Sequence, residues 1–230
     1  MNLRKFASIE AAAAVLAAQI VVTLRSALAA RPFASLAVPG GRTPAALFRA
    51  LRGAALDWER VRVTLTDERW VPDDDPASNA AMVRRELLED AAADAVFVPL
   101  YNAAASAAEG AASAWRAIAG AGVPFDAVVL GMGEDGHFAS LFPQSPGIGQ
   151  ALDPAAIPGC VAMRAPVAPA ERLSLNLAAL AGARQLNLLV TGADKLALLE
   201  RAAASPRGSG LPVDALLALR DPELEVLWSP

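Results

Sequence analysis

Residues 128–137 read Val-Val-Leu-Gly-Met-Gly-Glu-Asp-Gly-His, a short apolar run that enters a glycine-rich turn. An apolar run without alternation is typical of a strand buried on both faces, as in a parallel sheet. In open α/β sheets, ligands bind outside the carboxyl ends of such strands. The segment therefore predicts a parallel sheet, and it places Asp135 and His137 at the ligand-binding edge.

The same pattern of strand and turn recurs along the whole chain. Short apolar and β-branched runs predict strands at Ala34–Val38, Val61–Thr66, Ala95–Leu100, Ala127–Leu130, Val161–Arg164, Leu186–Val190 and Leu224–Trp228. Segments rich in Ala and Leu at helical spacing predict helices at Ser8–Ala30, Pro44–Arg52, Ser78–Asp90, Ala103–Ala119, Asp194–Ala204 and Val213–Leu219. Strands that alternate with helices indicate a mostly parallel sheet covered on both faces.

The composition indicates a single α/β domain over residues 1–230. The chain has 230 residues, of which 55% are hydrophobic, and a formal net charge of −4, and no linker or repeat divides it. Without an excess of basic residues, it lacks the positive field that nucleic-acid binding requires. With one cysteine and one histidine, it cannot form an internal disulfide or a histidine-rich metal cluster. We therefore expect a metal-independent, cytoplasmic protein that does not bind nucleic acid.

The first 32 residues allow two interpretations. Two basic residues followed by the apolar run 11–24 resemble a secretory signal. That run is shorter than the ~20 apolar residues that a membrane span needs. Glu10, Gln19 and Arg25 interrupt the charge pattern of a signal, which favours an amphipathic helix that covers a sheet.

Residues 39–44, after the first predicted strand, read Pro-Gly-Gly-Arg-Thr-Pro. The glycines let the backbone turn tightly, Thr43 is a good helix cap, and Pro44 suits a first helical turn. The N–H groups at such a helix start form an anion site. A Gly-Gly turn before Thr-Pro is also an ordinary way to begin a helix, so the pattern allows both interpretations.

Residues 66–72, after the second predicted strand, read Thr-Asp-Glu-Arg-Trp-Val-Pro. Three consecutive charged residues at a strand tip suggest that at least one faces a ligand, and a surface ion pair is the alternative. The acidic residues 73–75 are interpreted as a solvated loop, with Ser78 as a helix cap.

The glycine-rich turn of the opening segment carries the only histidine of the chain. Histidine moves protons near neutral pH, and a nearby carboxylate can orient its ring and raise its basicity. A lone histidine is often structural. The position of His137 among three glycines at a strand end favours a functional role, with Asp135 as its neighbour.

A fourth strand end reads Val190-Thr191-Gly192-Ala193-Asp194-Lys195. A lysine at a helix N-terminus is unfavourable unless an anion is also present, so Lys195 indicates a bound anion. Arg172 is a further candidate for the same ligand.

These four segments, in this order, resemble the 6-phosphogluconolactonase family. The most specific pieces are residues 66–72 with Ser78-Asn79, and residues 131–137 with Ala139-Ser140-Leu141-Phe142-Pro143. The resemblance implies a three-layer α/β/α sandwich with a mostly parallel, doubly wound sheet. It also implies hydrolysis of 6-phospho-D-glucono-1,5-lactone in the oxidative pentose phosphate pathway, without a cofactor or a metal.

The resemblance further implies roles for individual residues. His137 would act as the base on water and then as the acid on the leaving alcohol, oriented by Asp135 or Asp67. The phosphate would lie on Gly40, Gly41, Arg42, Thr43 and Lys195, with Arg69 and Arg172 as phosphate or oxyanion partners. The expected partner is a phosphorylated sugar lactone, with no membrane or nucleic acid involved, and the protein would be a monomer or weak homo-oligomer.

This chain departs from the family pattern at several positions, and two other functions remain. Pro39 and Arg42 stand where the family usually has serines, and Phe138 stands where it usually has threonine. The related glucosamine-6-phosphate deaminase uses a Glu five residues after the histidine, and here that residue is Phe142. A sugar-phosphate-sensing domain of a transcription regulator would need a DNA-reading module, and the chain before Ala34 has room for one helix.

Overall fold

The computed structural model describes residues 1–205 and 208–230. The strands are β1 (Asn2–Lys5), β2 (Ala34–Val38), β3 (Val61–Leu65), β4 (Asp67–Arg69), β5 (Val96–Val98), β6 (Ala127–Leu130), β7 (Cys160–Arg164), β8 (Glu171–Leu175), β9 (Gln185–Thr191) and β10 (Leu224–Ser229). The helices are α1 (Ile9–Ala30), α2 (Ala45–Arg52), α3 (Asn79–Glu86), α4 (Ala107–Gly122), α5 (Ile148–Ala151), α6 (Leu177–Ala181), α7 (Ala193–Ala204) and α8 (Val213–Leu217). Short 3-10 helices, η1 and η2, lie at Trp58–Arg60 and Asp90–Asp94.

A parallel sheet forms the centre of the molecule. Its strand order over the described residues is β1-β10-β9-β6-β2-β3-β5, and every neighbouring pair is parallel. From β2 the chain moves outward through β3 to β5, and it then returns to β6 and moves the other way through β9 to β10. The predicted doubly wound α/β fold is therefore confirmed. The order reverses between β2 and β6, where such sheets bind ligands.

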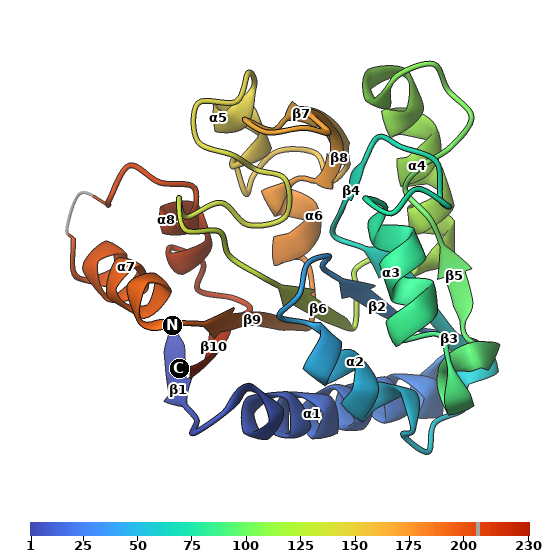
Figure 1. Cartoon of the computed structure of the whole chain (residues 1–230). Coiled ribbons are helices and arrows are strands. Elements are labelled where there is room, and N and C mark those ends of the chain that lie inside the picture. The colour runs from blue at the N-terminus through green and yellow to red at the C-terminus, as the bar shows by residue number, and fades with distance from the viewer. Residues whose placement is uncertain (206–207) are drawn as a thin grey trace.

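Helices cover both faces of this sheet (Figure 1). Helix α1 packs on β2, β6, β9 and β10, and it lies beneath the sheet in the view of Figure 1, together with α2. Helix α4 packs on β2, β3 and β5 from the other side. The β2 and β6 strands between these layers are wholly buried, which explains why Ser35 is the one polar residue in the two strands.

Helix α1 is held by an apolar face and a capped start. Ser8 accepts a hydrogen bond from the N–H of Ala11, and Leu16, Ile20 and Leu24 are buried against the sheet. Burying each of these three side chains stabilises the fold by roughly 1.5–3 kcal/mol. By length and composition alone the helix could cross a membrane, with a mean hydropathy of 1.8, but core helices and signal sequences pass the same test. In this structure it covers a sheet.

A second, three-stranded sheet lies beside the parallel one. The strand predicted at Val161–Arg164 is present as β7, and it pairs with β8 in an antiparallel sheet ordered β4-β8-β7. An apolar run does not reveal which neighbour it will pair with, and the connection from β7 to β8 is a short hairpin. Strand β8 was not predicted at all.

Smaller differences follow from local caps. The helix expected over Ser78–Asp90 ends at Glu86, and a 3-10 helix follows it. The helix expected from Ala103 begins at Ala107, because the side chain of Ser106 accepts the N–H of Glu109 and so caps the first turn.

Candidate active site

A cleft of about 380 Å³ lies at the carboxyl ends of the parallel strands. Of the residues selected from sequence, those that line it are Gly40, Gly41, Arg42, Thr43, Asp67, Arg69, His137, Arg172 and Lys195. They come from the ends of β2, β3, β6 and β9 and from the small sheet. Asp135 is not among the lining residues, and its position is behind His137.

Asp135 holds the imidazole of His137. The Oδ1 atom of Asp135 lies 2.5 Å from Nδ1 of His137, and it also accepts the backbone N–H of His137 at 3.2 Å. A carboxylate acceptor favours the ring tautomer with its proton on Nδ1, which leaves Nε2 as a free acceptor. The side chain of His137 is 27% exposed and lines the cleft, so the imidazole is accessible to water.

The glycine turn makes room for this arrangement. A Cβ on Gly133 would lie 2.2 Å from two ring atoms of His137, so only glycine lets the imidazole lie against the backbone there. Gly136 has a φ of +74°, a conformation that residues with a side chain rarely adopt. On another side, the ring of Phe142 contacts the imidazole, with the centroids 4.3 Å apart.

Asp67 does not contact His137. Its carboxylate accepts the hydroxyl of Ser140 at 2.6 Å and that of Thr66 at 3.3 Å, and it is 8% exposed. Of the two carboxylates that could orient the imidazole, Asp135 is therefore the one that contacts it. Asp67 lines the cleft, and the hydrogen-bond partners of its carboxylate are both hydroxyl groups.

The glycine turn after β2 is packed directly on Asn79. A Cβ on Gly40 would lie 2.0 Å from Oδ1 of Asn79, which is far inside contact distance. The amide of Asn79 is oriented by its Nδ2, which donates to the backbone oxygen of Asp67 at 2.8 Å. Oδ1 is buried and has no hydrogen-bond partner. Asn79 thus fixes the spacing between the glycine turn and Asp67.

The start of α2 differs from its sequence-based interpretation. Pro44, rather than Thr43, is the capping residue, and no side chain caps the N-terminus of the helix. The hydroxyl of Thr43 instead lies 3.5 Å from the hydroxyl of Thr191, at the end of β9. The two turns that were predicted to hold a phosphate are therefore neighbours. Arg42 is exposed at the cleft.

Arg69 and Arg172 lie directly opposite each other across the β4–β8 pair. Arg69 donates from Nη1 to the backbone oxygen of Ala77 at 2.6 Å. Arg172 is 6% exposed, its Nε has no partner, and no carboxylate of the described residues lies within 4 Å of its guanidinium. Burial lowers the pKa of Arg172, the charge of Arg69 lowers it further, and Asp67 with Glu68 opposes the shift. Asp67 and Glu68 thus compensate the buried charge only in part, without forming an ion pair with it, and an incompletely compensated buried cation is costly to keep. The pair can bind a negatively charged group.

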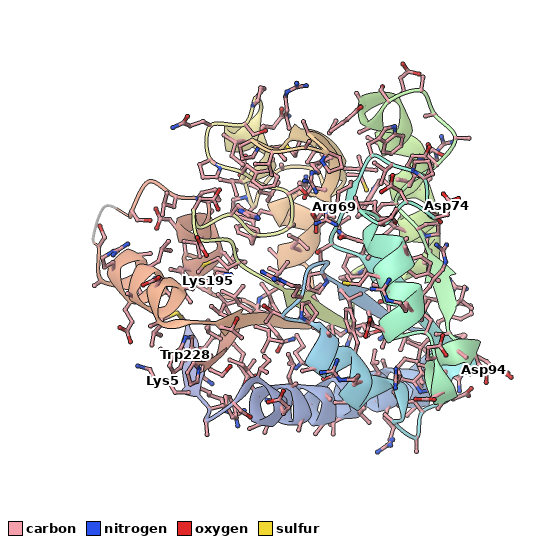
Figure 2. All side chains as sticks on the ribbon, in the orientation of Figure 1. Lys5, Arg69, Asp74, Asp94, Lys195 and Trp228 are labelled. Carbon is pink, nitrogen blue, oxygen red and sulfur yellow. The ribbon has the colours of Figure 1, made fainter. Side chains whose placement is uncertain are left out.

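Lys195 lies in the first turn of α7 and Arg69 lies on β4, so the two side chains reach the cleft from different elements (Figure 2). Within residues 1–205 and 208–230, no carboxylate forms an ion pair with Lys195 at 4 Å or less. The turn before it is fixed by Trp228, whose indole N–H donates to the backbone oxygen of Gly192 at 2.8 Å. Gly192 itself has a φ of +97°.

Glu68 is a buried carboxylate that serves structure. It accepts the backbone N–H groups of Arg69, Asn79 and Ala80 and the hydroxyl of Ser78, at 2.7 to 3.1 Å. Burial raises the pKa of Glu68, and these backbone N–H groups partly offset that shift. The carboxylate thereby joins β4 to the start of α3. Across the described part of the chain, no group of three or more His, Cys, Asp or Glu residues is placed to hold a metal ion.

A family model described as glucosamine-6-phosphate isomerases/6-phosphogluconolactonase matches residues 7–228. The chain belongs to this family.

Members of the glucosamine-6-phosphate isomerase/6-phosphogluconolactonase family resemble the chain over its full length. It is 43% identical over 229 residues to a protein of Rhizobium meliloti (strain 1021) named 6-phosphogluconolactonase, covering 100% of this chain and 99% of the relative. It is 45% identical over 215 residues to one of the same name from Pseudomonas aeruginosa, covering 94% and 89%. A crystal structure of a 6-phosphogluconolactonase from Shewanella baltica OS155 matches with a TM-score of 0.94 and 39% identity, covering 100% and 98%.

Two cleft residues of this family member were not selected from its sequence. Asn79 was quoted only as part of a motif, next to the helix cap Ser78, and its contact with Gly40 joins segments that are far apart in the chain. Phe142 was quoted as part of a motif and as the residue that replaces a glutamate, and its contact with the imidazole was not predicted. The glycine at position 40 was a signal that another group approaches closely, but it did not reveal which group.

Proposed function

We propose that the protein hydrolyses 6-phospho-D-glucono-1,5-lactone to 6-phosphogluconate, as a step of the oxidative pentose phosphate pathway. The observation that carries this proposal is the cleft, in which an accessible imidazole held by a carboxylate shares one space with four cationic side chains. These are Arg42, Arg69, Arg172 and Lys195. The names of relatives at 43% and 45% identity support the same reaction.

His137 carries both proton transfers. Nε2 removes a proton from water as the water oxygen attacks the lactone carbonyl carbon, and Asp135 stabilises the resulting imidazolium. When the tetrahedral intermediate collapses, the bond between the carbonyl carbon and the ring oxygen breaks, and Nε2 returns the proton to that oxygen. A positioned base of this kind contributes about 10²–10⁴-fold to the rate.

The cations divide into two groups. Arg172 and Arg69 face the reacting end and stabilise the charge that develops on the carbonyl oxygen, where fixed cations act most strongly. The glycine turn, Arg42 and Lys195 hold the phosphate. Binding the distant phosphate orients the carbonyl towards His137, so that binding energy supports the chemical step.

Phe142 supports hydrolysis over the isomerisation catalysed by the related deaminases. That relay needs a carboxylate five residues after the histidine, and here an aromatic ring at that position packs on the imidazole. Incubation with glucosamine 6-phosphate should therefore release no ammonia.

The decisive experiment supplies freshly prepared lactone and follows acid release in a pH-stat, with subtraction of the spontaneous rate. The wild-type protein should accelerate the release, and His137→Ala should lower kcat by about 10²-fold or more. Equal rates for the two proteins would contradict the proposed role of His137. No acceleration by the wild-type protein would refute the function itself.

We further infer a cytoplasmic protein that works as a monomer or weak homo-oligomer, without a membrane or nucleic acid. Its net charge of −4 and its single cysteine support this setting. Light scattering coupled to size-exclusion chromatography tests the oligomeric state, and cell fractionation tests the compartment.

A further inference from the structure

A segment far along the chain packs against the turn that carries His137. The backbone N–H of Val213 donates to the carbonyl oxygen of Gly136 at 3.0 Å. The Cβ position of Gly136 lies 3.0 Å from Cβ of Leu211, so the leucine side chain lies directly on the glycine. Gly136 is the residue between Asp135 and His137. Leu211 and Val213 therefore contact the backbone that joins these two residues.

The carboxylate of Asp214 organises that segment. Its Oδ2 accepts the backbone N–H groups of Ser209, Gly210 and Leu211 at 2.6, 2.7 and 3.2 Å, and its Oδ1 accepts the Ser209 hydroxyl at 2.8 Å. Consecutive N–H groups that converge on one point form a concavity that favours an anion. Gly208 and Gly210 have φ values of +76° and +78°, so the backbone has little conformational preference of its own.

The segment that carries Asp214 is fixed at both of its ends. A Cβ on Gly208 would lie 2.8 Å from Oδ2 of Asp214, which requires glycine there. On its other side, α8 is anchored in the core by Val213 and Leu216, both 0% exposed. The segment is thus fixed at one end by apolar burial and at the other by Asp214.

We propose that Asp214 is a positioning residue for the reaction under "Proposed function", on which this inference rests. By holding the 209–211 turn, it keeps Leu211 against Gly136 and so sets the angle at which Asp135 presents Nε2 of His137 to the cleft. A displacement of about 1 Å at a reacting group can cost about 10²-fold in rate, so a support outside the cleft affects the chemistry.

The test uses the fact that the chain has one histidine. Protein labelled with ¹⁵N in histidine gives one pair of ring-nitrogen signals, which report the tautomer directly. In Asp214→Ala, we expect kcat to fall about tenfold with KM changed less than about twofold. We expect the ring-nitrogen signals to move towards those of a ring that exchanges freely between tautomers.

A matched control removes a similar carboxylate elsewhere. Asp153 is exposed, accepts the N–H of Ala155 at 2.9 Å, and does not line the cleft. Asp153→Ala should keep the wild-type kcat and ring-nitrogen signals. Leu211→Ala keeps the Asp214 turn and the leucine Cβ but removes Cδ1, which lies 3.1 Å from the Cβ position of Gly136. It should change kcat and the ring-nitrogen signals in the same direction as Asp214→Ala, by a smaller amount.

The possible outcomes test the role of Asp214 separately from the lactonase function. If Asp214→Ala and Leu211→Ala only lower the unfolding temperature and keep kcat and the ring signals, Asp214 is purely structural and the proposal is wrong. If Asp214→Ala does not fold, Asp214→Asn and Leu211→Ala decide by the same two readouts. The ring signals need no lactone, so a wild-type protein without lactonase activity would refute the function while leaving this measurement valid.

Discussion

The imidazole of His137 lies against the ring of Phe142, with the centroids 4.3 Å apart and the ring planes at 40°. Phe142 is 7% exposed and therefore packed on its other sides as well. One side of the histidine is thus closed by an apolar surface, and Asp135 supplies its hydrogen-bond partner. The ring is left with one free nitrogen, Nε2. A general base needs such a nitrogen to accept a proton from water.

The role of Asp135 is tested by Asp135→Asn. An amide in this place can donate to Nδ1, which favours the wrong tautomer and places the proton on Nε2. We expect kcat to fall by about 10²-fold with little change in KM, measured by acid release. Asp67→Asn should have a smaller effect on kcat, because Asp67 contacts hydroxyls and not the imidazole. A larger loss in Asp67→Asn would reverse this assignment.

Replacing Arg172 with methionine should stabilise the protein and weaken its activity. The substitution removes a buried charge that forms no ion pair and that Asp67 and Glu68 compensate only in part, so the free energy of unfolding should rise by about 1 kcal/mol. The activity should fall about tenfold or more, because charge on the carbonyl oxygen loses a partner. Urea unfolding and pH-stat assays measure the two effects. The surface variant Arg85→Met should change stability by less than about 0.5 kcal/mol. A less stable Arg172→Met would show that Arg172 already has sufficient compensation.

A methyl group at position 40 should damage both the fold and the cleft. In Gly40→Ala the new Cβ meets the amide of Asn79, which must shift and so lose its bond to Asp67. We expect a loss of about 1–3 kcal/mol in unfolding free energy, together with weaker substrate binding. Gly53→Ala is the control, since a Cβ there meets nothing within 4 Å. Equal stability of the two variants would refute the close packing.

The proposed phosphate-binding role of Lys195 predicts an effect on KM rather than on kcat. Lys195→Ala should raise KM for the phosphorylated lactone about tenfold, because one charge-assisted contact is lost. Inorganic phosphate should raise the unfolding temperature of the wild-type protein, and it should do so less for the variant. An unchanged KM and an unchanged phosphate effect would remove Lys195 from the site.

The single cysteine should be inert in the folded protein. Burial raises the pKa of Cys160 to about 12. Because thiolate is the reactive form, a pKa above the ordinary value of ~8.5 lowers reactivity at every pH below it, and at pH 8 only about 0.01% is thiolate. A disulfide reagent should react slowly with the native protein and stoichiometrically in urea. Rapid labelling of the native protein would contradict this prediction.

Local sequence identified the strand ends well and their partners poorly. The turns after β2, β6 and β9 were all predicted, because glycine, a capping residue and an apolar run are neighbours in the chain. The pairing of β7 with β8 and the contact of Asn79 with Gly40 depend on distant segments, and no local pattern encodes them. For the same reason, the sequence left open whether Asp67 or Asp135 contacts His137.

The close approach of Asn79 to Gly40 also bears on how this sequence can change over time. A side chain at position 40 becomes tolerable only after position 79 has lost volume, and that loss removes the amide that holds Asp67. Whichever of the two substitutions occurs first is unfavourable. In natural drift or directed evolution, both would therefore have to occur together. The two positions therefore form a barrier that should keep laboratory lineages from exploring this turn.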